Sequence, residues 1–156
     1  MIPGVETIPL TTHVDERGFF REILKSSQIT KFGQWSMSWM VQDTIKAWHI
    51  HKVQTDYWFV VSGVVKAAVC KINDEGMNSF SEAVRAGYYS EVYTYTLGDN
   101  QMPEVLVIPP GVAHGLKVLQ GPAVLMYVTS EEYNPKDEGR IPYDALGYDW
   151  FKQDIR

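Results

Sequence analysis

The chain has 156 residues, of which 13% are aromatic and 21% charged, the composition of a folded globular protein. Its net charge of −5 includes no run of five like charges, which argues against a nucleic-acid or anionic-membrane surface because such surfaces need clustered lysines and arginines. The N-terminus lacks a signal peptide and no stretch approaches the roughly 20 apolar residues of a membrane span, so we expect a soluble, cytoplasmic protein.

Short strands separated by turn residues run through most of the chain. A short helix is predicted near Ser27–Phe32, and Ser79 with Glu82 can cap another that ends at Gly87. The predicted strands are Trp58–Val61, Val64–Val69 (separated from the first by Gly63), Val92–Leu97, Val105–Ile108 and Val124–Val128. No linker or repeat divides the chain, so residues 1–156 are predicted to form one domain. Many strands with little helix predict an all-β sandwich or barrel that can hold one ligand.

Two of the four histidines, His49 and His51, are two residues apart, so on a strand they face the same side. A buried imidazole needs a polar partner, so such a pair is uncommon in a core and indicates that at least one histidine lines a site. The competing interpretation is an exposed pair on an edge strand. His114 follows a Pro-Pro-Gly turn between two strands, which predicts a position at the mouth of a barrel. His13 lies among polar turn residues and is expected to be exposed.

Tyr133 and Arg17 are ambiguous when each is considered alone. Tyr133 precedes Asn-Pro, a turn signal, so its ring is expected at a strand end. A tyrosine there serves more often in packing than as a proton donor. Arg17 follows a turn-like Asp-Glu, which is typical of a solvated surface charge.

Five segments together resemble the dTDP-4-dehydrorhamnose 3,5-epimerase family of cupin-type barrels over nearly the whole chain. They are DERGFFRE (15–22), VQDT (41–44), KAWHIH (46–51), IPPGVAHGL (108–116) and EEYNPKDEGRI (131–141), followed by a terminal YDW. The resemblance implies a double-stranded β-helix (jelly-roll) and a homodimer that exchanges an N-terminal strand. It implies a nucleotide-diphosphate 4-keto-6-deoxy sugar as substrate, and no metal or organic cofactor.

The resemblance also implies a mechanism. A base removes a proton beside the C4 ketone, and an acid returns a proton to the opposite face, which inverts the carbon. By similarity His49 is the base and Tyr133 the acid; an unperturbed histidine pKa near 6.5 suits the base. Asp144 is the candidate carboxylate that would fix the tautomer of His49. Arg17 and Lys46 match diphosphate-binding positions, although Lys46 replaces an arginine and loses its bidentate fork.

The remaining candidates include departures from the family pattern. Glu22 and His114 match ligand-contact positions, whereas His51 stands where a glutamine is usual. Asp56 stands where the family has a lysine that helps to hold the enolate oxygen, and a negative charge there would destabilise an enolate. Because Lys71 falls near a position where the family carries an aspartate, we hypothesise that the two have exchanged places across strands.

Three other functions remain open. His49, His51, Asp56 and His114 resemble the metal-binding motifs of the wider cupins, which hold Fe, Mn, Ni or Zn for isomerase or dioxygenase chemistry. Paired histidines on one strand also resemble the nucleotide-sugar 3,4-ketoisomerases. The third alternative is a barrel that binds a sugar nucleotide without turnover, since the enolate-stabilising lysine is missing.

Overall fold

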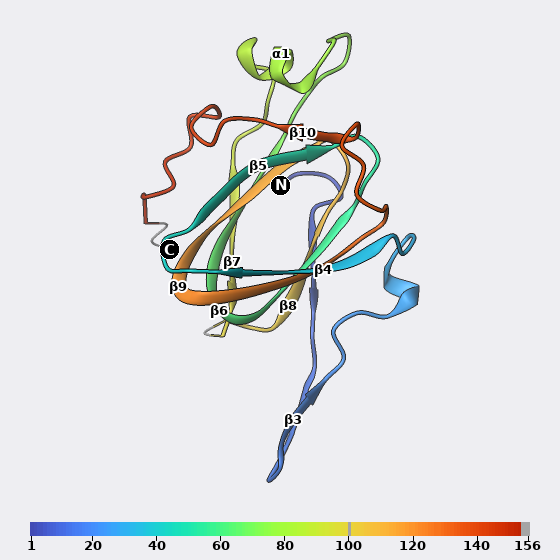
Figure 1. The fold of residues 1–156 in the computed structure, drawn as a ribbon, viewed down its shortest axis with the longest axis vertical. Coiled ribbons are helices and arrows are strands. Elements are labelled where there is room, and N and C mark those ends of the chain that lie inside the picture. The colour runs from blue at the N-terminus through green and yellow to red at the C-terminus, as the bar shows by residue number, and fades with distance from the viewer. Residues whose placement is uncertain (100, 154–156) are drawn as a thin grey trace.

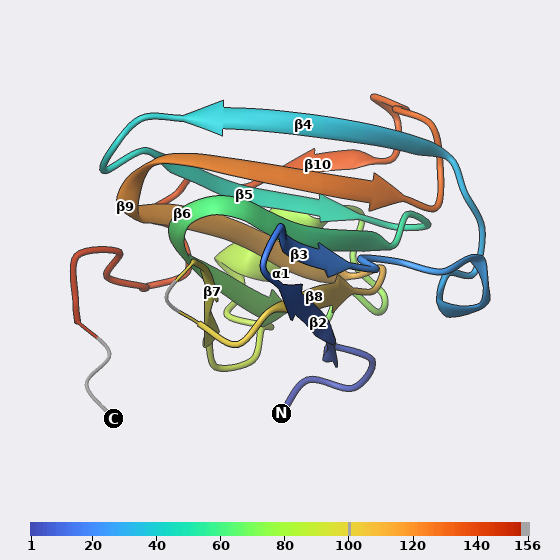
Figure 2. The same cartoon turned by 90° about the horizontal axis from the view of Figure 1, so that it is seen from below.

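Two layers of antiparallel β-structure stack face to face, as Figures 1 and 2 show from two directions. The structure is a computed structural model and describes residues 1–99 and 101–153. Its elements in chain order are β1 (Glu6–Pro9), β2 (Thr12–Asp15), β3 (Gly18–Arg21), the 3-10 helix η1 (Ser26–Gln28), β4 (Gln34–Met40), β5 (Ile45–His51), β6 (Asp56–Lys71), α1 (Phe80–Arg85), β7 (Tyr93–Gly98), β8 (Glu104–Ile108), β9 (Val112–Thr129) and β10 (Glu138–Arg140).

The long strands β6 and β9 belong to both layers. The first half of β6 and the second half of β9 form one layer in the order β1–β8–β6–β9–β4. Their other halves form the second layer in the order β7–β6–β9–β5–β10. This is a jelly-roll arrangement, and it confirms the all-β prediction.

A bulged bend at Gly63 lets β6 pass from one layer to the other. The register with β9 shifts around this residue, and Gly63 has a φ of +77°. A Cβ there would lie 2.6 Å from the carbonyl oxygen of Gln120, so only glycine fits. The two strands predicted on either side of Gly63 are therefore one bent strand. The runs predicted at 92–97 and 105–108 correspond to β7 and β8, and the run at 124–128 lies inside the longer β9.

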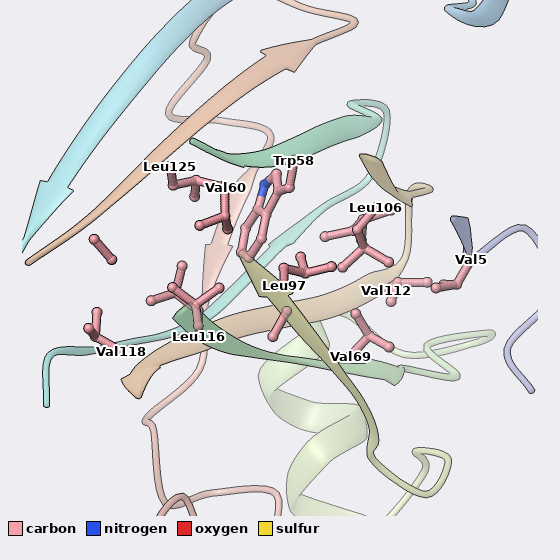
Figure 3. Close-up of a cluster of buried hydrophobic side chains, with 14 of the residues drawn as sticks. Val5, Trp58, Val60, Val69, Leu97, Leu106, Val112, Leu116, Val118 and Leu125 are labelled. Carbon is pink, nitrogen blue, oxygen red and sulfur yellow. The ribbon is translucent and has the colours of Figure 1, made fainter. Parts of the chain in front are cut away.

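The main hydrophobic core lies between the two layers (Figure 3). Strand alternation sends every second side chain inward from both layers. The labelled members are Val5, Trp58, Val60, Val69, Leu97, Leu106, Val112, Leu116, Val118 and Leu125. A second cluster, which includes Trp48, Ile50 and Trp150, packs under α1 and the C-terminal segment. Each fully buried aliphatic side chain contributes about 1.5–3 kcal/mol, so these two clusters hold the strands that carry the polar residues described below.

Helices are few, as predicted. α1 begins after Ser79, whose hydroxyl accepts the Glu82 N–H, and it ends just before Gly87, which has a φ of +80°. The helix predicted near Ser27–Phe32 is only the single turn η1. Over residues 1–99 and 101–153, no helix is long and apolar enough to cross a membrane.

Candidate active site

A cavity of about 240 Å³ opens between the two layers. It is lined by Gln34, Ser38, Met40, Lys46, His49, His51, Gln54, Asp56, Trp58, His114, Leu116, Leu125, Tyr127, Thr129, Tyr133, Asn134 and Glu138. Alternation along β5 sends Trp48 and Ile50 into the second core and leaves His49 and His51 to line the cavity. This confirms that the two histidines face the same side.

His49 is held by a carboxylate from the neighbouring strand. Glu138, on β10, places Oε1 2.9 Å from His49 Nδ1. A carboxylate only accepts hydrogen bonds, so Nδ1 carries the proton and Nε2 is left free. Burial raises the pKa of Glu138, but the hydrogen bond from His49 and the charge of Arg140 outweigh it, and the pKa lies below its ordinary value. Glu138 is therefore ionised at neutral pH.

Glu138, and not Asp144 as predicted, is the carboxylate that contacts His49. Asp144 is exposed in the C-terminal segment and does not line the cavity. The structure therefore corrects the predicted partner of His49. The second Glu138 oxygen, Oε2, lies 3.5 Å from the hydroxyl of Tyr133 and 3.3 Å from Arg140. Tyr133 lies beyond the end of β9, as predicted, and its side of the cavity is open to solvent, since the residue is 62% exposed.

His51 has a carboxylate of its own. Asp137 Oδ2 lies 3.8 Å from His51 Nδ1, and the two Asp137 oxygens accept the backbone N–H groups of residues 52–54. On the other side of the ring, Gln54 Nε2 lies 3.3 Å from His51 Nε2. The adjacent residues Asp137 and Glu138 thus each face one of the two histidines.

The deepest part of the cavity, here called the cavity floor, consists of Asp56, Trp58 and His114. Asp56 accepts hydrogen bonds from Gln54 Nε2 at 2.7 Å and from Trp58 Nε1 at 3.1 Å. His114 Nδ1 donates to the Val112 carbonyl at 3.0 Å, and its Nε2 lies 3.6 Å from Asp56 Oδ2. Burial lowers the pKa of His114 to about 4, although the charge of Asp56 opposes the shift. The ring is neutral at neutral pH.

A metal site of the wider cupin type would need His49 as a fourth ligand. Only His51, Asp56 and His114 gather their ligand atoms within 4.8 Å of one another among the described residues. His49 lies outside this group, and its Nδ1 contacts Glu138. The four-residue set is therefore corrected to a group of three.

The other predicted ligand contacts divide into two groups. Lys46 lines the cavity and donates to Ser38 Oγ at 2.6 Å. Arg17 lies at the turn of the β2–β3 hairpin, which extends away from the layers (Figure 1); its side chain is 85% exposed and pairs with Asp15. Glu22 pairs with Lys25 and does not line the cavity of its own chain. Neither Arg17 nor Glu22 reaches the histidines of the same chain.

Lys71 does not take the place of the missing lysine. Its ammonium lies against Gly111, in the turn after β8, and the residue does not line the cavity. Asp56 does line it, so the hypothesis of an exchange between Asp56 and Lys71 is corrected. Gln54, Asp137 and Glu138 also contribute to the site and were not predicted from the sequence. The last two stand side by side in the EEYNPKDEGRI segment, and the pair of adjacent carboxylates beside the proposed acid was the available signal.

Comparisons with known proteins point to one family. The sequence profile described as dTDP-4-dehydrorhamnose 3,5-epimerase matches residues 1–156. The spore coat polysaccharide biosynthesis protein SpsL of Bacillus subtilis (strain 168) is 35% identical, with 96% of this chain and 97% of that protein covered. A dTDP-4-dehydrorhamnose 3,5-epimerase of Mycobacterium tuberculosis (strain CDC 1551 / Oshkosh) is 31% identical, with 96% and 74% covered.

Solved structures give the same picture. The Mycobacterium tuberculosis rmlC epimerase superimposes with a TM-score of 0.77 at 28% identity, over 96% of this chain and 75% of that one. The dTDP sugar isomerase of Desulfovibrio desulfuricans G20 superimposes with a TM-score of 0.80 over 98% and 94%, and at 23% identity this likeness concerns the fold alone.

Proposed function

Because this chain belongs to the dTDP-4-dehydrorhamnose 3,5-epimerase family, we propose that its cavity epimerises a nucleotide-linked 4-keto-6-deoxy sugar, with His49 as the base. The chain is an isomerase, and its substrate is a nucleotide sugar. The observation that carries the assignment of the base is the contact between His49 Nδ1 and Glu138.

His49 has the features that a general base requires. The Glu138 carboxylate keeps the Nδ1 proton in place, so Nε2 is available to remove a proton beside the ketone. The same carboxylate stabilises the imidazolium that forms. The His49 side chain is 36% exposed, so a substrate in the cavity can reach it.

Tyr133 supplies the proton on the other face in this proposal. Its hydroxyl gives a proton to the planar enolate and inverts the carbon; solvent then returns a proton to the phenolate and takes one from the His49 imidazolium. Its backbone N–H donates to Gln34 Oε1 at 2.7 Å, which anchors the loop while leaving the exposed ring free to close over a sugar. At 3.5 Å, its contact with Glu138 is weak enough to be exchanged for one with the substrate.

We propose that the nucleotide diphosphate lies toward Lys46 and that a second copy of the chain supplies Arg17. Lys46 is the one lysine or arginine that lines the cavity in the part of the chain that the structure describes, and it donates to Ser38 Oγ. Arg17 lies on a hairpin that projects from the barrel, so it is presented to another molecule and not to its own cavity. An exchanged hairpin in a homodimer would bring Arg17, and with it Glu22, to the partner's site.

An apolar outer surface on the first layer supports the homodimer. The alternation of β4 exposes Trp35, Met37 and Trp39, each at least 60% exposed. Beside them lies an open apolar groove of about 650 Å³, whose lining includes Phe19 and Phe20 of the hairpin. Contiguous exposed apolar surface of this kind marks an interaction site. We also propose that residues 1–156 act as one domain in the cytoplasm, where the free buried thiol of Cys70 stays reduced.

The test is the fate of a nucleotide-linked 4-keto-6-deoxyglucose incubated with the chain in heavy water and followed by NMR. Epimerisation predicts a product inverted at C3, C5 or both, with deuterium at each inverted carbon. A barrel that only binds its ligand would leave the sugar unlabelled, and this result would contradict the proposal.

A 3,4-ketoisomerase is the second candidate, and the observation that favours it is the contact between His51 and Asp137. This second imidazole, backed by a carboxylate and on the same face as His49, could move a proton between neighbouring carbons. In the same NMR experiment, a 3,4-ketoisomerase predicts that the ketone moves from C4 to C3 and that C5 is not inverted.

A further inference from the structure

The side-chain amide of Gln54 has its orientation fixed by a neighbouring carboxylate. Its Nε2 lies 2.7 Å from Asp56 Oδ1 and 3.3 Å from His51 Nε2. Because a carboxylate only accepts hydrogen bonds, the end of the amide that faces Asp56 is the NH2 group. This group has two hydrogens, so it donates one to Asp56 and the other to His51. Gln54 is buried and lines the cavity together with both partners.

The contact with Gln54 determines which nitrogen of His51 carries the proton. Nε2 faces an N–H donor, so it supplies the lone pair. In the neutral ring the proton is then on Nδ1, which faces Asp137 Oδ2 at 3.8 Å. Both ring nitrogens are therefore directed at protein groups, and the side chain is only 11% exposed. His49 differs, because Glu138 holds only its Nδ1 and its side chain is 36% exposed.

Two carboxylates hold Gln54 in this orientation. Asp56 is itself fixed, because its Oδ2 accepts the indole N–H of the buried Trp58 at 3.1 Å. Asp137 accepts the backbone N–H groups of residues 52–54, and its Oδ2 lies 3.3 Å from the backbone nitrogen of Gln54. The backbone and the amide of Gln54 are thus both tied to carboxylates. Asp56, which stands where the family resemblance implies a lysine, here anchors Gln54.

We propose that Gln54 is a positioning residue that keeps His51 out of proton transfer and so makes the cavity specific for epimerisation. The inference rests on the proposed function. A general base needs a lone pair that the substrate can reach. His49 Nε2 has such a lone pair, whereas the lone pair of His51 Nε2 is occupied by the Gln54 amide.

Movement of the ketone from C4 to C3 needs more proton transfers than inversion does. The C3 proton is removed and the C4 oxygen gains a proton, which gives an enediol. The C3 hydroxyl then loses its proton while C4 gains one, and the C3 ketone forms without any oxidant or reductant. A second imidazole on the face of His49 would serve these transfers. His51 lies on that face but is held by Gln54, so the contact weighs against the 3,4-ketoisomerase as a function of this chain.

The first measurement is the tautomer of His51 in the full chain without substrate. Two-dimensional NMR that correlates the ring protons with both ring ¹⁵N nuclei, at about pH 8 where an ordinary imidazole is neutral, should place the proton on Nδ1. Gln54→Met keeps the length of the side chain and removes the donor, so the resonance of Nε2 should shift downfield. Gln42→Met is the matched control, because Gln42 uses both ends of its amide, toward Gly121 and Leu119, outside the cavity. It should leave the His51 resonances unchanged.

The second measurement is the product formed from dTDP-4-keto-6-deoxyglucose, followed by NMR in heavy water. Wild type and Gln42→Met should give the inverted sugar. Gln54→Met should form the C3 ketone about 100-fold faster than wild type, the lower end of what a positioned base contributes. This increase should disappear in the double variant Gln54→Met/His51→Asn. Thermal unfolding of each variant checks that it is folded.

Three results would overturn the inference. The first is a proton on Nε2 of His51 in the wild type, a measurement that needs no variant. The second is an unchanged Nε2 resonance in folded Gln54→Met. The third is a folded Gln54→Met protein that forms no more C3 ketone than wild type, or forms it equally well without His51. Failure of the proposed function would differ, since wild type would leave the sugar unlabelled, and the tautomer is measured without any sugar.

Discussion

Replacing Glu138 by glutamine tests how the base is controlled. Glu138 Oε1 accepts from His49 Nδ1 at 2.9 Å, while Oε2 faces the donors of Arg140 and Tyr133. A hydrogen bond to a charged group contributes about 1.5–3 kcal/mol, and the lower part of that range applies because the His49 side chain is 36% exposed. Loss of about 1.5–2 kcal/mol of imidazolium stabilisation slows proton removal roughly 10- to 30-fold.

The tautomer adds to this loss. A glutamine that keeps its carbonyl toward Arg140 and Tyr133 turns its NH2 group toward His49 Nδ1. In molecules with this orientation, Nδ1 accepts a hydrogen bond and the ring proton moves to Nε2. Nε2 can then no longer act as the base. We therefore expect kcat to fall about 100-fold in Glu138→Gln with KM little changed.

The assay is the rate of solvent-deuterium incorporation into the keto sugar, measured by NMR under saturating substrate. Asp144→Asn is the matched control, because Asp144 is an exposed carboxylate outside the cavity. A change of less than about threefold in Glu138→Gln, or an equal loss in Asp144→Asn, would refute the argument that Glu138 orients and stabilises His49.

Three further predictions concern the acid, the buried histidine and the dimer. Tyr133→Phe should stop inversion while deuterium still enters the sugar with retention of configuration, because His49 is left as the only proton carrier. NMR of the recovered substrate measures this exchange, and loss of all exchange would argue against the assignment of Tyr133 as the acid. Because the pKa of His114 is about 4 in the fold, against about 6.5 when unfolded, the unfolded chain binds more protons in that window and stability falls with acid. The free energy of unfolding, measured with urea, should fall by about 2 kcal/mol between pH 7 and pH 5, and His114→Gln should lack that fall. An equal fall in the variant would contradict this prediction. Trp39→Glu should give a folded monomer in analytical ultracentrifugation, whereas a surviving dimer would show that the β4 surface is not the interface.

The fold was predictable because its signals are local. Runs of β-branched and aromatic residues marked β7 and β8, and the serine cap and final glycine marked α1. The continuity of β6 through Gly63 was not predictable, because a glycine with positive φ can end a strand or bend it. The choice depends on the close approach of β9, which is a tertiary contact.

The site was predictable only in part for the same reason. His49 and His51 are two residues apart on one strand, so their side chains point to the same face, and the sequence alone predicts that they lie close together. Glu138 comes from a three-residue strand that carries no hydrophobic pattern, and only its antiparallel pairing with β5 brings it to His49. Asp144 was predicted from the family resemblance, and its position along the chain does not report which side chain turns inward. The contacts of Asp56 with Trp58 and His114 likewise depend on both strands that cross the floor.

The most direct test of the central claim is the rate at which deuterium from solvent enters the carbons beside the ketone, compared between wild type and His49→Asn. With His49 as the base, wild type labels the inverted product and the variant is slower by about 100-fold or more while still binding the nucleotide sugar. Labelling that continues at the wild-type rate in a folded His49→Asn protein would contradict the claim.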